Sequence, residues 1–426
     1  MPVSASADPS CFLSGLFGLA VEAADPMRVV AAHLPQRPKG RLVVIGAGKA
    51  SARMAEAVEA HYGPCEGLVI TRYGYARECQ GIQIAEAAHP VPDEAGVAAT
   101  RRLLDLVAGL GPDDLVLALI SGGGSALLCA PAQGLTLDDK MAVNRALLAS
   151  GAPIGQMNVV RKHLSAVKGG RLAAACHPAR LLTLLISDVP GDDPGQIASG
   201  PTVGETSSPA DVQAILRKYG IDLSPQVRSV LGRPSTVVSP DDARLETAET
   251  RIIAAPSQSL AVARDAAETA GCEVRTLGDA LEGEARDLGA EQARLALSLT
   301  DHVQATGKPL LLLSGGECTV TRRGDGVGGP NAEFTLAAAL ELNGHPDIHV
   351  LACDTDGVDG AAEVAGAYAG PRTLITAREQ GIDPTAALAR NDAHSFFAAI
   401  DDQIVTGPTL TNVNDFRAIL ILPSRG

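Results

Sequence analysis

The chain has 426 residues, enough for two or three domains, and its composition of 46% apolar and 20% charged residues is that of a globular protein. A formal net charge of −14 disfavours nucleic acid and anionic membranes as partners, because both would be repelled. The eight cysteines include no Cys-x-x-Cys pair, and we find no run of about 20 apolar residues. We therefore expect a cytoplasmic protein with free thiols, no membrane span and no zinc site.

Short apolar runs alternate with amphipathic segments along most of the chain, which predicts an α/β fold. The predicted strands cover residues 41–46, 67–71, 115–121, 181–187, 251–256, 273–278, 309–317, 349–357 and 416–422. The segment 232–250 is rich in Pro, Ser and acids and has weak periodicity, so it marks a boundary. We expect two domains, 1–238 and 249–426, each with a largely parallel or mixed sheet flanked by helices.

The first glycine-rich turn follows the first strand and contains Gly46, Gly48 and Lys49. A strand that enters such a turn and opens a helix presents backbone N–H groups to an anion. A Walker A loop would need Gly where the chain has Val43, and a dinucleotide fingerprint would need Gly at Ser51. A lysine at a helix N-terminus opposes the helix dipole, so Lys49 is predicted to meet negative charge. The alternative is a tight turn without a ligand.

A second glycine-rich loop follows the strand 115–121 and is also predicted to bind an anion, since only glycine allows such close backbone approach. Its residues are Ser121, Gly122, Gly123, Gly124 and Ser125. A shorter turn at 314–317 ends in Glu317, and a ligand there is about as well supported as a plain turn.

The stretch 158–202 concentrates charged side chains around another buried strand. The candidates for an anionic substrate are Asn158, Arg161, Lys162 and Lys168, and Asp188 and Asp192 follow the strand. Cations followed by acids at the carboxyl end of a strand indicate a site for a charged ligand and a metal.

Two later segments are further candidates. Asp354 and Asp356 resemble a magnesium loop more than a calcium loop, and the alternative is an acid cluster on a solvated turn. Asn331 lies at the mouth of a predicted helix within the glycine-dense segment 322–334, which is either a ligand-closing loop or a surface hairpin.

Seven segments, VIGAGKAS, LISGGGSALL, NVVRKHLSAVKGGRLA, SDVPGDDPGQIASGPT, LLSGGECTV, DTDGVDG and TGPTLTNVNDF, occur in this order. In this arrangement the chain resembles the type II glycerate kinases, which are glycerate 2-kinases with a C-terminal MOFRL domain and are often labelled hydroxypyruvate reductase. The resemblance implies ATP- and Mg²⁺-dependent phosphorylation of D-glycerate to 2-phosphoglycerate. It also implies a Rossmann-like domain at 1–238, a MOFRL-type domain at 249–426 and an active site in the cleft between them.

The resemblance implies that Lys49 is the catalytic lysine. Many members carry an arginine where this chain has Pro330, and another is common where it has Val327. Either Arg322 or Arg323 substitutes from the same loop, or the chain is a subgroup variant.

On this view Lys49 neutralises the transferring phosphoryl group and the loop 121–125 cradles an anion. Arg161 or Lys162 holds the carboxylate of glycerate, while Asp188 and Asp192 bind magnesium or act as base. The expected partners are D-glycerate and ATP, and the sequence leaves a homo-oligomeric state open. The alternatives are an NAD(P)H-dependent hydroxypyruvate reductase and a sugar-acid-binding regulator without turnover.

Overall fold

The computed structural model describes residues 5–360 and 362–424, which fall into two compact units. One unit is formed by residues 26–253, and the other by the segment up to Asp25 together with residues 254–426. The predicted α/β class with parallel and mixed sheets is confirmed.

The division differs from the predicted one, 1–238 and 249–426, at both ends of the first domain. Helix α1 (Pro9–Ala23) belongs to the second unit, because its apolar face packs into that unit's core. The Pro- and Ser-rich segment belongs to the first unit, because Val238 is buried and its N–H donates to Gly169. The polar segment 232–250 is therefore part of the first unit, and the chain passes to the second unit only after Ile253.

The first unit contains a six-stranded sheet of order β3-β2-β1-β4-β5-β6. The strands are β1 (Leu42–Ala47), β2 (Glu66–Arg72), β3 (Ile82–Ala87), β4 (Leu115–Ile120), β5 (Arg180–Ile186) and β6 (Ala248–Ala254). β1 pairs in parallel with β2 and β4, and the β2–β3 and β4–β5 pairs are also parallel. The chain builds outward from β1 to β3 and then returns to place β4 on the other side of β1. This reversal creates a topological switch point at the carboxyl ends of β1 and β4, where open α/β sheets bind ligands.

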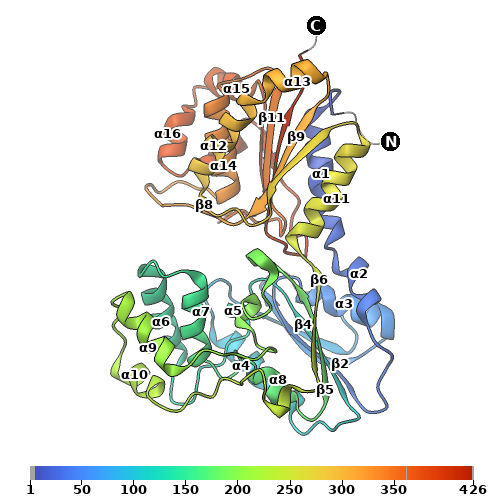
Figure 1. The fold of residues 1–426 in the computed structure, drawn as a ribbon, viewed down its shortest axis with the longest axis vertical. Coiled ribbons are helices and arrows are strands. Elements are labelled where there is room, and N and C mark those ends of the chain that lie inside the picture. Colours follow the sequence, from blue (N-terminus) through green and yellow to red (C-terminus); the bar gives the residue numbers. More distant parts are fainter. Residues whose placement is uncertain (1–4, 361, 425–426) are drawn as a thin grey trace. The chain divides into compact units, whose positions relative to one another are not determined.

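The helices of this unit form two groups. α2 (Pro26–Val29), α3 (Ser51–Tyr62), α4 (Glu94–Val107), α5 (Gly124–Leu127) and α8 (Arg171–Cys176) lie by the sheet. The helical cluster consists of α6 (Leu137–Ala149), α7 (Ile154–His163), α9 (Pro209–Lys218) and α10 (Pro225–Leu231), and has an apolar core of its own. Figure 1 shows this cluster gathered beside one end of the sheet.

The second unit contains a mixed sheet of order β13-β12-β11-β14-β9-β7. The strands are β7 (Glu273–Gly278), β9 (Leu310–Gly316), β11 (Ile348–Asp354), β12 (Gly366–Ala369), β13 (Gln403–Ile404) and β14 (Asp415–Ile421), and a separate pair is formed by β8 (Gly283–Glu284) and β10 (Cys318–Thr319). Only β7–β9 is parallel among the pairings within the six-stranded sheet of the described chain.

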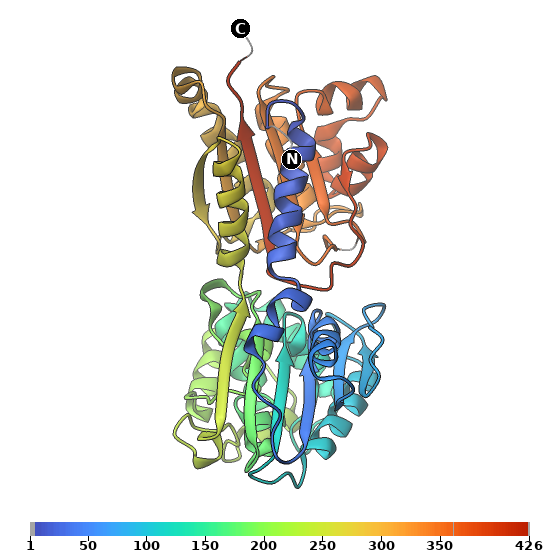
Figure 2. The same ribbon diagram turned by 90° about the vertical axis from the view of Figure 1, so that its right-hand side faces the viewer.

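Helices cover both faces of the mixed sheet (Figures 1 and 2). α1 and α11 (Pro256–Thr269) pack on one face, and α12 (Ala285–Ser298) and α14 (Pro330–Leu342) pack on the other. The remaining helices are α13 (Thr300–Thr306), α15 (Thr373–Glu379), α16 (Pro384–Ala389) and α17 (Ala393–Ala399). Across residues 5–360 and 362–424, we find no helix with the length and apolarity needed to cross a membrane. All eight cysteines are free; six are buried, Cys79 is half-buried and Cys11 is exposed.

Candidate active site

The first two glycine-rich turns interlock at the switch point of the parallel sheet. The Lys49 N–H donates to the Gly122 carbonyl (2.8 Å), and the Ala50 N–H donates to the Ser121 hydroxyl (3.0 Å). The Ser121 N–H in turn donates to Ala47 at the end of β1 (3.3 Å). Two segments more than 70 residues apart in sequence therefore form one backbone surface at the carboxyl ends of β1 and β4.

Glycine is required at this surface for steric reasons. Gly48 has a φ of +147°, and a Cβ there would overlap the Ser121 hydroxyl. Gly123 has a φ of +79°, and its Cβ would lie 3.2 Å from Cγ of Lys49 and 3.1 Å from Cδ2 of His89. The Gly123 backbone thus lies against two cationic or ionisable side chains. His89 was not predicted as a site residue, and no sequence spacing connected it with this loop.

The other predicted glycines serve the packing of this turn. A side chain on Gly46 would overlap the Leu119 carbonyl of β4, and one on Gly124 would lie 2.7 Å from the Ala198 side chain. Gly46 therefore allows β1 and β4 to pair closely, and Gly124 allows α5 to approach the loop after β5.

A polar network joins α7 to the loop 121–125. The Asn158 side chain donates to Gln196 (2.9 Å) and accepts from Ser199 (3.3 Å), and the hydroxyls of Ser199 and Ser125 are hydrogen-bonded (2.7 Å). The structure therefore brings together the predicted residues Asn158 and Ser125. Gln196 and Ser199 lie in the segment SDVPGDDPGQIASGPT, but only its acids were singled out, because Gln and Ser carry no charge that would mark them as ligands.

Lys168 is buried at the junction between the same loops. Its ammonium donates to the carbonyls of Ser125 (3.0 Å) and Ala198 (3.2 Å). Burial, and then the field of Lys140, lowers the pKa of Lys168 well below its usual value. Ala198 and Ser199 have φ values of 51° and 62°, a left-handed conformation that costs energy for residues other than glycine.

Arg161 and Lys162 are adjacent in sequence, but the structure gives them different partners. The Lys162 ammonium forms an ion pair with Glu205, and both side chains are almost fully buried. Arg161 donates to the side-chain oxygens of Asn144 (2.9 Å) and Asn158 (3.2 Å), which carry no charge. Of the two candidates for the substrate carboxylate, Lys162 is therefore neutralised internally, whereas the charge of Arg161 is uncompensated.

The predicted acids of the first unit lie in the loop that follows β5. Asp188 is half-buried two residues beyond the end of β5. Asp192 has a φ of 54°, and its Oδ1 atom is buried without a hydrogen-bond partner in the described chain. We find no group of three or more His, Cys, Asp or Glu residues arranged to hold a metal among residues 5–360 and 362–424.

The predicted acids of the second unit stabilise a turn. Asp354 accepts from the N–H of Asp356 (2.9 Å), and Asp356 accepts from the N–H of Val358 (2.8 Å). This geometry is that of side chains that cap a turn. Asp356 is fully buried, so the turn is not the solvated one of the alternative, and the magnesium loop stays a prediction.

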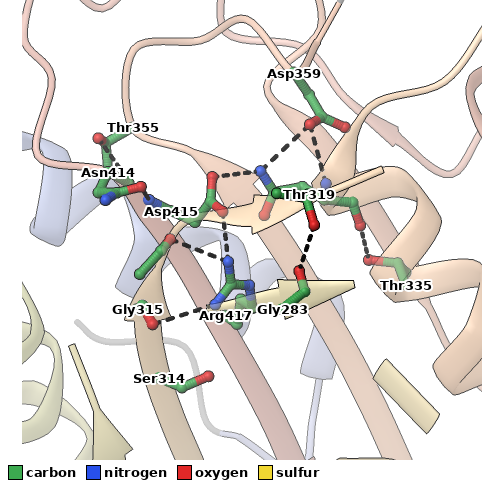
Figure 3. Close-up of polar contacts among 12 residues, drawn as sticks. Gly283, Ser314, Gly315, Thr319, Thr335, Thr355, Asp359, Asn414, Asp415 and Arg417 are labelled. Atoms are coloured by element: carbon green, nitrogen blue, oxygen red, sulfur yellow. Dashed lines mark hydrogen bonds and ion pairs between the residues drawn. The ribbon is translucent and has the colours of Figure 1, made fainter. Parts of the chain in front are cut away.

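Asn331 is fully buried at the start of α14, in a polar network whose members Asp359, Asp415 and Arg417 are labelled in Figure 3. Asp359 accepts from the N–H groups of Asn331 (3.0 Å) and Ala332 (2.8 Å), and the Asn331 side chain donates to Asp415 (2.7 Å). Asp415 also pairs with Arg417, and burial raises its pKa. The carboxylate of Asp359 thus binds the N–H groups at the start of α14, where Asn331 was predicted to bind a ligand.

The structure also shows the positions of Pro330, of its two proposed arginine substitutes and of Glu317. Pro330 is the first residue of α14, a position that favours proline. Arg322 is exposed and donates to the Gly324 carbonyl (3.2 Å), and Arg323 is exposed as well. Glu317 is exposed directly after β9.

Comparison with known proteins identifies the family. A model described as a domain of unknown function (DUF4147) matches residues 12–232, and one described as the MOFRL family matches residues 310–415. D-glycerate 2-kinase of Thermotoga maritima is 36% identical over 94% of this chain and 96% of the relative. The chain belongs to the glycerate kinase family.

The family is also recognisable from its structure, but its members carry two names. A crystal structure of glycerate kinase from Thermotoga maritima matches with a TM-score of 0.84 and 36% identity, over 96% of this chain and 98% of that chain. A relative from Agrobacterium vitis, provisionally named hydroxypyruvate reductase, is 52% identical over 96% of this chain and 94% of the relative. The resemblance seen in the seven ordered segments is confirmed.

Proposed function

We propose that this chain is a cytoplasmic, ATP- and Mg²⁺-dependent kinase that phosphorylates D-glycerate at its 2-hydroxyl to give 2-phosphoglycerate. The observation that carries the proposal is the interlocked pair of glycine turns at the switch point, with Lys49 beside Gly123. Membership of the glycerate kinase family supports the same reaction. The eight free cysteines favour a reducing compartment.

The switch point has the features that a polyphosphate needs. Gly48 and Gly123 have positive φ values that let the two turns pack closely, and the side chain of Lys49 lies against Gly123 at their junction. Phosphoryl transfer depends mainly on positioning and on neutralisation of charge. Lys49 would neutralise charge on the transferring group, while the amides of the loop 121–125 hold its oxygens in place.

The loop after β5 fits a magnesium ion better than the turn at 354–356. The buried and unpartnered Oδ1 of Asp192 is a hard oxygen donor, and Asp188 lies on the same loop. These two carboxylates would hold the ion, which would supply charge neutralisation between nucleotide and protein. Asp188 would alternatively accept the proton of the 2-hydroxyl as general base.

Two observations favour a second candidate function, the NAD(P)H-dependent reduction of hydroxypyruvate. Relatives with the reductase name are more than half identical, and the strand order β3-β2-β1-β4-β5-β6 is shared with dinucleotide-binding folds. However, the third fingerprint glycine is Ser51, whose buried hydroxyl donates to Leu119 (2.9 Å), and β2 ends in Thr71-Arg72 where an acid would bind ribose. We therefore rank the kinase first.

The deciding assay supplies D-glycerate, ATP and Mg²⁺ and follows ADP release, with phosphorus NMR to identify the product. The kinase proposal predicts 2-phosphoglycerate and no oxidation of NADH in the presence of hydroxypyruvate. Formation of 3-phosphoglycerate would retain the kinase but reject the proposed substrate orientation. NADH consumption without ADP release would establish the reductase instead.

Lys49→Ala tests the role of the lysine. We expect kcat to fall by about 10²- to 10³-fold, the effect of removing one group that stabilises transition-state charge. Lys39→Ala is the matched control, because Lys39 is exposed in the same unit before β1. Turnover of Lys49→Ala near that of the control would reject Lys49 as the catalytic lysine.

A further inference from the structure

Three basic side chains gather between the helical cluster and the loop 121–125, and no acid among residues 5–360 and 362–424 forms an ion pair with them. Arg161 contacts only uncharged amides, and Lys168 contacts only backbone carbonyls. The third is Lys140 of α6, whose ammonium makes no hydrogen bond or ion pair with any residue of the described chain. Sequence reasoning missed Lys140, because an isolated lysine on a helix is most often a solvated one.

The position of Lys140 follows from the helix that carries it. Asn144 lies one turn further along α6 and accepts two hydrogen bonds from the Arg161 guanidinium of α7. Residues four apart share a helix face, so Lys140 is on the face that meets Arg161. Leu147, one turn beyond Asn144, is fully buried in the core of the helical cluster. Lys140 is therefore at the inner edge of α6.

The electrostatics of these side chains agree with that position. Burial lowers the pKa of Lys140, the nearby Cys129 thiol acts in the opposite direction, and the charges of Arg161 and Arg171 lower the pKa further. Arg171 is a further cation with an unsatisfied donor, because its Nη2 atom is buried without a hydrogen-bond partner in the described chain. Lys140 and Arg161 are half-buried and Lys168 is buried, and cations withdrawn from water without counter-charges are costly unless an anionic ligand compensates them.

A chain of hydrogen bonds connects this cluster to the proposed phosphate loop. Arg161 donates to Asn158, Asn158 accepts from Ser199, and the Ser199 hydroxyl bonds that of Ser125. Lys168 also reaches Ser125 through its carbonyl. An anion bound at Lys140 and Arg161 would consequently lie next to the surface at which phosphoryl transfer is proposed.

We propose that Lys140, together with Arg161, forms the subsite that binds the carboxylate of a 2-hydroxy acid and so determines substrate specificity. The proposal rests on the proposed kinase function and deepens it. A small hydroxy acid carries its carboxylate on the carbon next to the reacting hydroxyl, so both must be held close together. The planar guanidinium of Arg161 suits a carboxylate, and the ammonium of Lys140 adds a second charge-assisted donor. The proposed function already assigns the phosphates of ATP to Lys49 and the two glycine turns.

Lys140→Met tests the subsite, because it keeps the length of the side chain and removes the charge. We expect KM for D-glycerate to rise about 10- to 100-fold, as for the loss of a hydrogen bond to a charged group, with KM for ATP unchanged. Selectivity for D-glycerate over glycerol, which lacks the carboxylate, should fall by the same factor. Lys140→Arg should recover most of the loss, and Lys218→Met, at an exposed position on α9, is the control.

Direct binding separates this proposal from the kinase function. Calorimetry of D-glycerate with the wild type and Lys140→Met, without ATP, should show about the same 10- to 100-fold weakening. Equal affinity of the two proteins would overturn the subsite even if the wild type is an active kinase. Weakened binding in a protein that releases no ADP would keep the subsite and reject the kinase. A rise in KM for ATP alone would instead assign Lys140 to the nucleotide.

Discussion

At the scale of single residues, Gly123 shows how backbone conformation and site chemistry depend on each other. Its φ of +79° is accessible to glycine at little cost, and its Cα faces the side chains of Lys49 and His89. Any side chain at this position would be strained and would also displace the proposed catalytic lysine. The two effects can be separated, because Gly109 has a similar φ of +76° but no atom near the position of its Cβ.

Gly123→Ala should therefore lower activity, whereas Gly109→Ala should not. Both variants are expected to lose about 1–2 kcal/mol of stability, the cost of a left-handed residue with a Cβ. Only Gly123→Ala should also lower kcat/KM, by at least about tenfold, since a small misplacement of a catalytic group has such effects. Steady-state kinetics at a temperature where both variants are folded provides the measurement. Equal activity of the two would mean that the loop does not position Lys49.

Individual site residues could be predicted where a motif marks them. Lys49 and the loop 121–125 follow buried strands, so both the position and the chemistry are visible in the sequence. His89 and Lys140 could not be found in this way, because only the folded chain brings His89 to Gly123 and Lys140 near Arg161. Ser199 lies in a quoted segment but was not singled out within it. The difference between Arg161 and Lys162 depends on Glu205, more than 40 residues away in sequence.

At the scale of elements, the start of α14 depends on one carboxylate. Asp359 accepts from two N–H groups at the first turn and contacts His394 at 3.0 Å, all within the protein interior. Asp383 serves α16 in the same way, since it accepts from the N–H groups of Thr385 and Ala386, but it is exposed. The two aspartates form a natural comparison of a buried and an exposed helix cap.

Asp359→Ala should destabilise the second unit much more than Asp383→Ala. Loss of an exposed cap costs about 1 kcal/mol, whereas removal of one partner from a buried charged network costs about 3–5 kcal/mol. Urea denaturation followed by circular dichroism would measure both values. If the two variants lose similar stability, the network around Asn331 contributes little beyond an ordinary cap.

Elements were predictable where burial made them uniformly apolar. The nine predicted strands correspond to β1, β2, β4, β5, β6, β7, β9, β11 and β14. β3 was missed because it is an edge strand with the mixed sequence IQIAEA, and β12 is a short run of small residues. Strand direction was not readable either, because a strand buried on both faces has the same pattern in parallel and antiparallel sheets.

At the scale of the whole molecule, the course of the chain between the units could not be predicted. α1 is an amphipathic helix of a common kind, and only its tertiary contacts show that it packs with residues 254–426. The match to the DUF4147 family begins at residue 12, within this helix, so the family boundary and the structural boundary differ. Truncation at a sequence-based boundary would therefore remove a helix from the core of the second unit.

Stability in acid offers a test of packing in that second unit. His349 of β11 is buried, and its Nδ1 is hydrogen-bonded to the Tyr368 hydroxyl (2.6 Å). Burial lowers the pKa of His349 to about 4, whereas an unfolded histidine titrates near about 6.5. Above the unfolded pKa the imidazole is neutral in both states. Between these two values the unfolded state binds a proton that the folded state does not, so stability is lost as the pH falls.

The full loss corresponds to about 3 kcal/mol, from about 1.4 kcal/mol for each pKa unit. His349→Gln keeps a side chain that can hydrogen-bond Tyr368 but cannot titrate, so its stability should fall less steeply than that of the wild type between pH 6.5 and about 4. Acids with lowered pKa values destabilise both proteins equally over this range, and the difference between them isolates one imidazole. Parallel curves for wild type and His349→Gln would show that His349 is hydrated when folded, and that β11 packs more loosely than its burial implies.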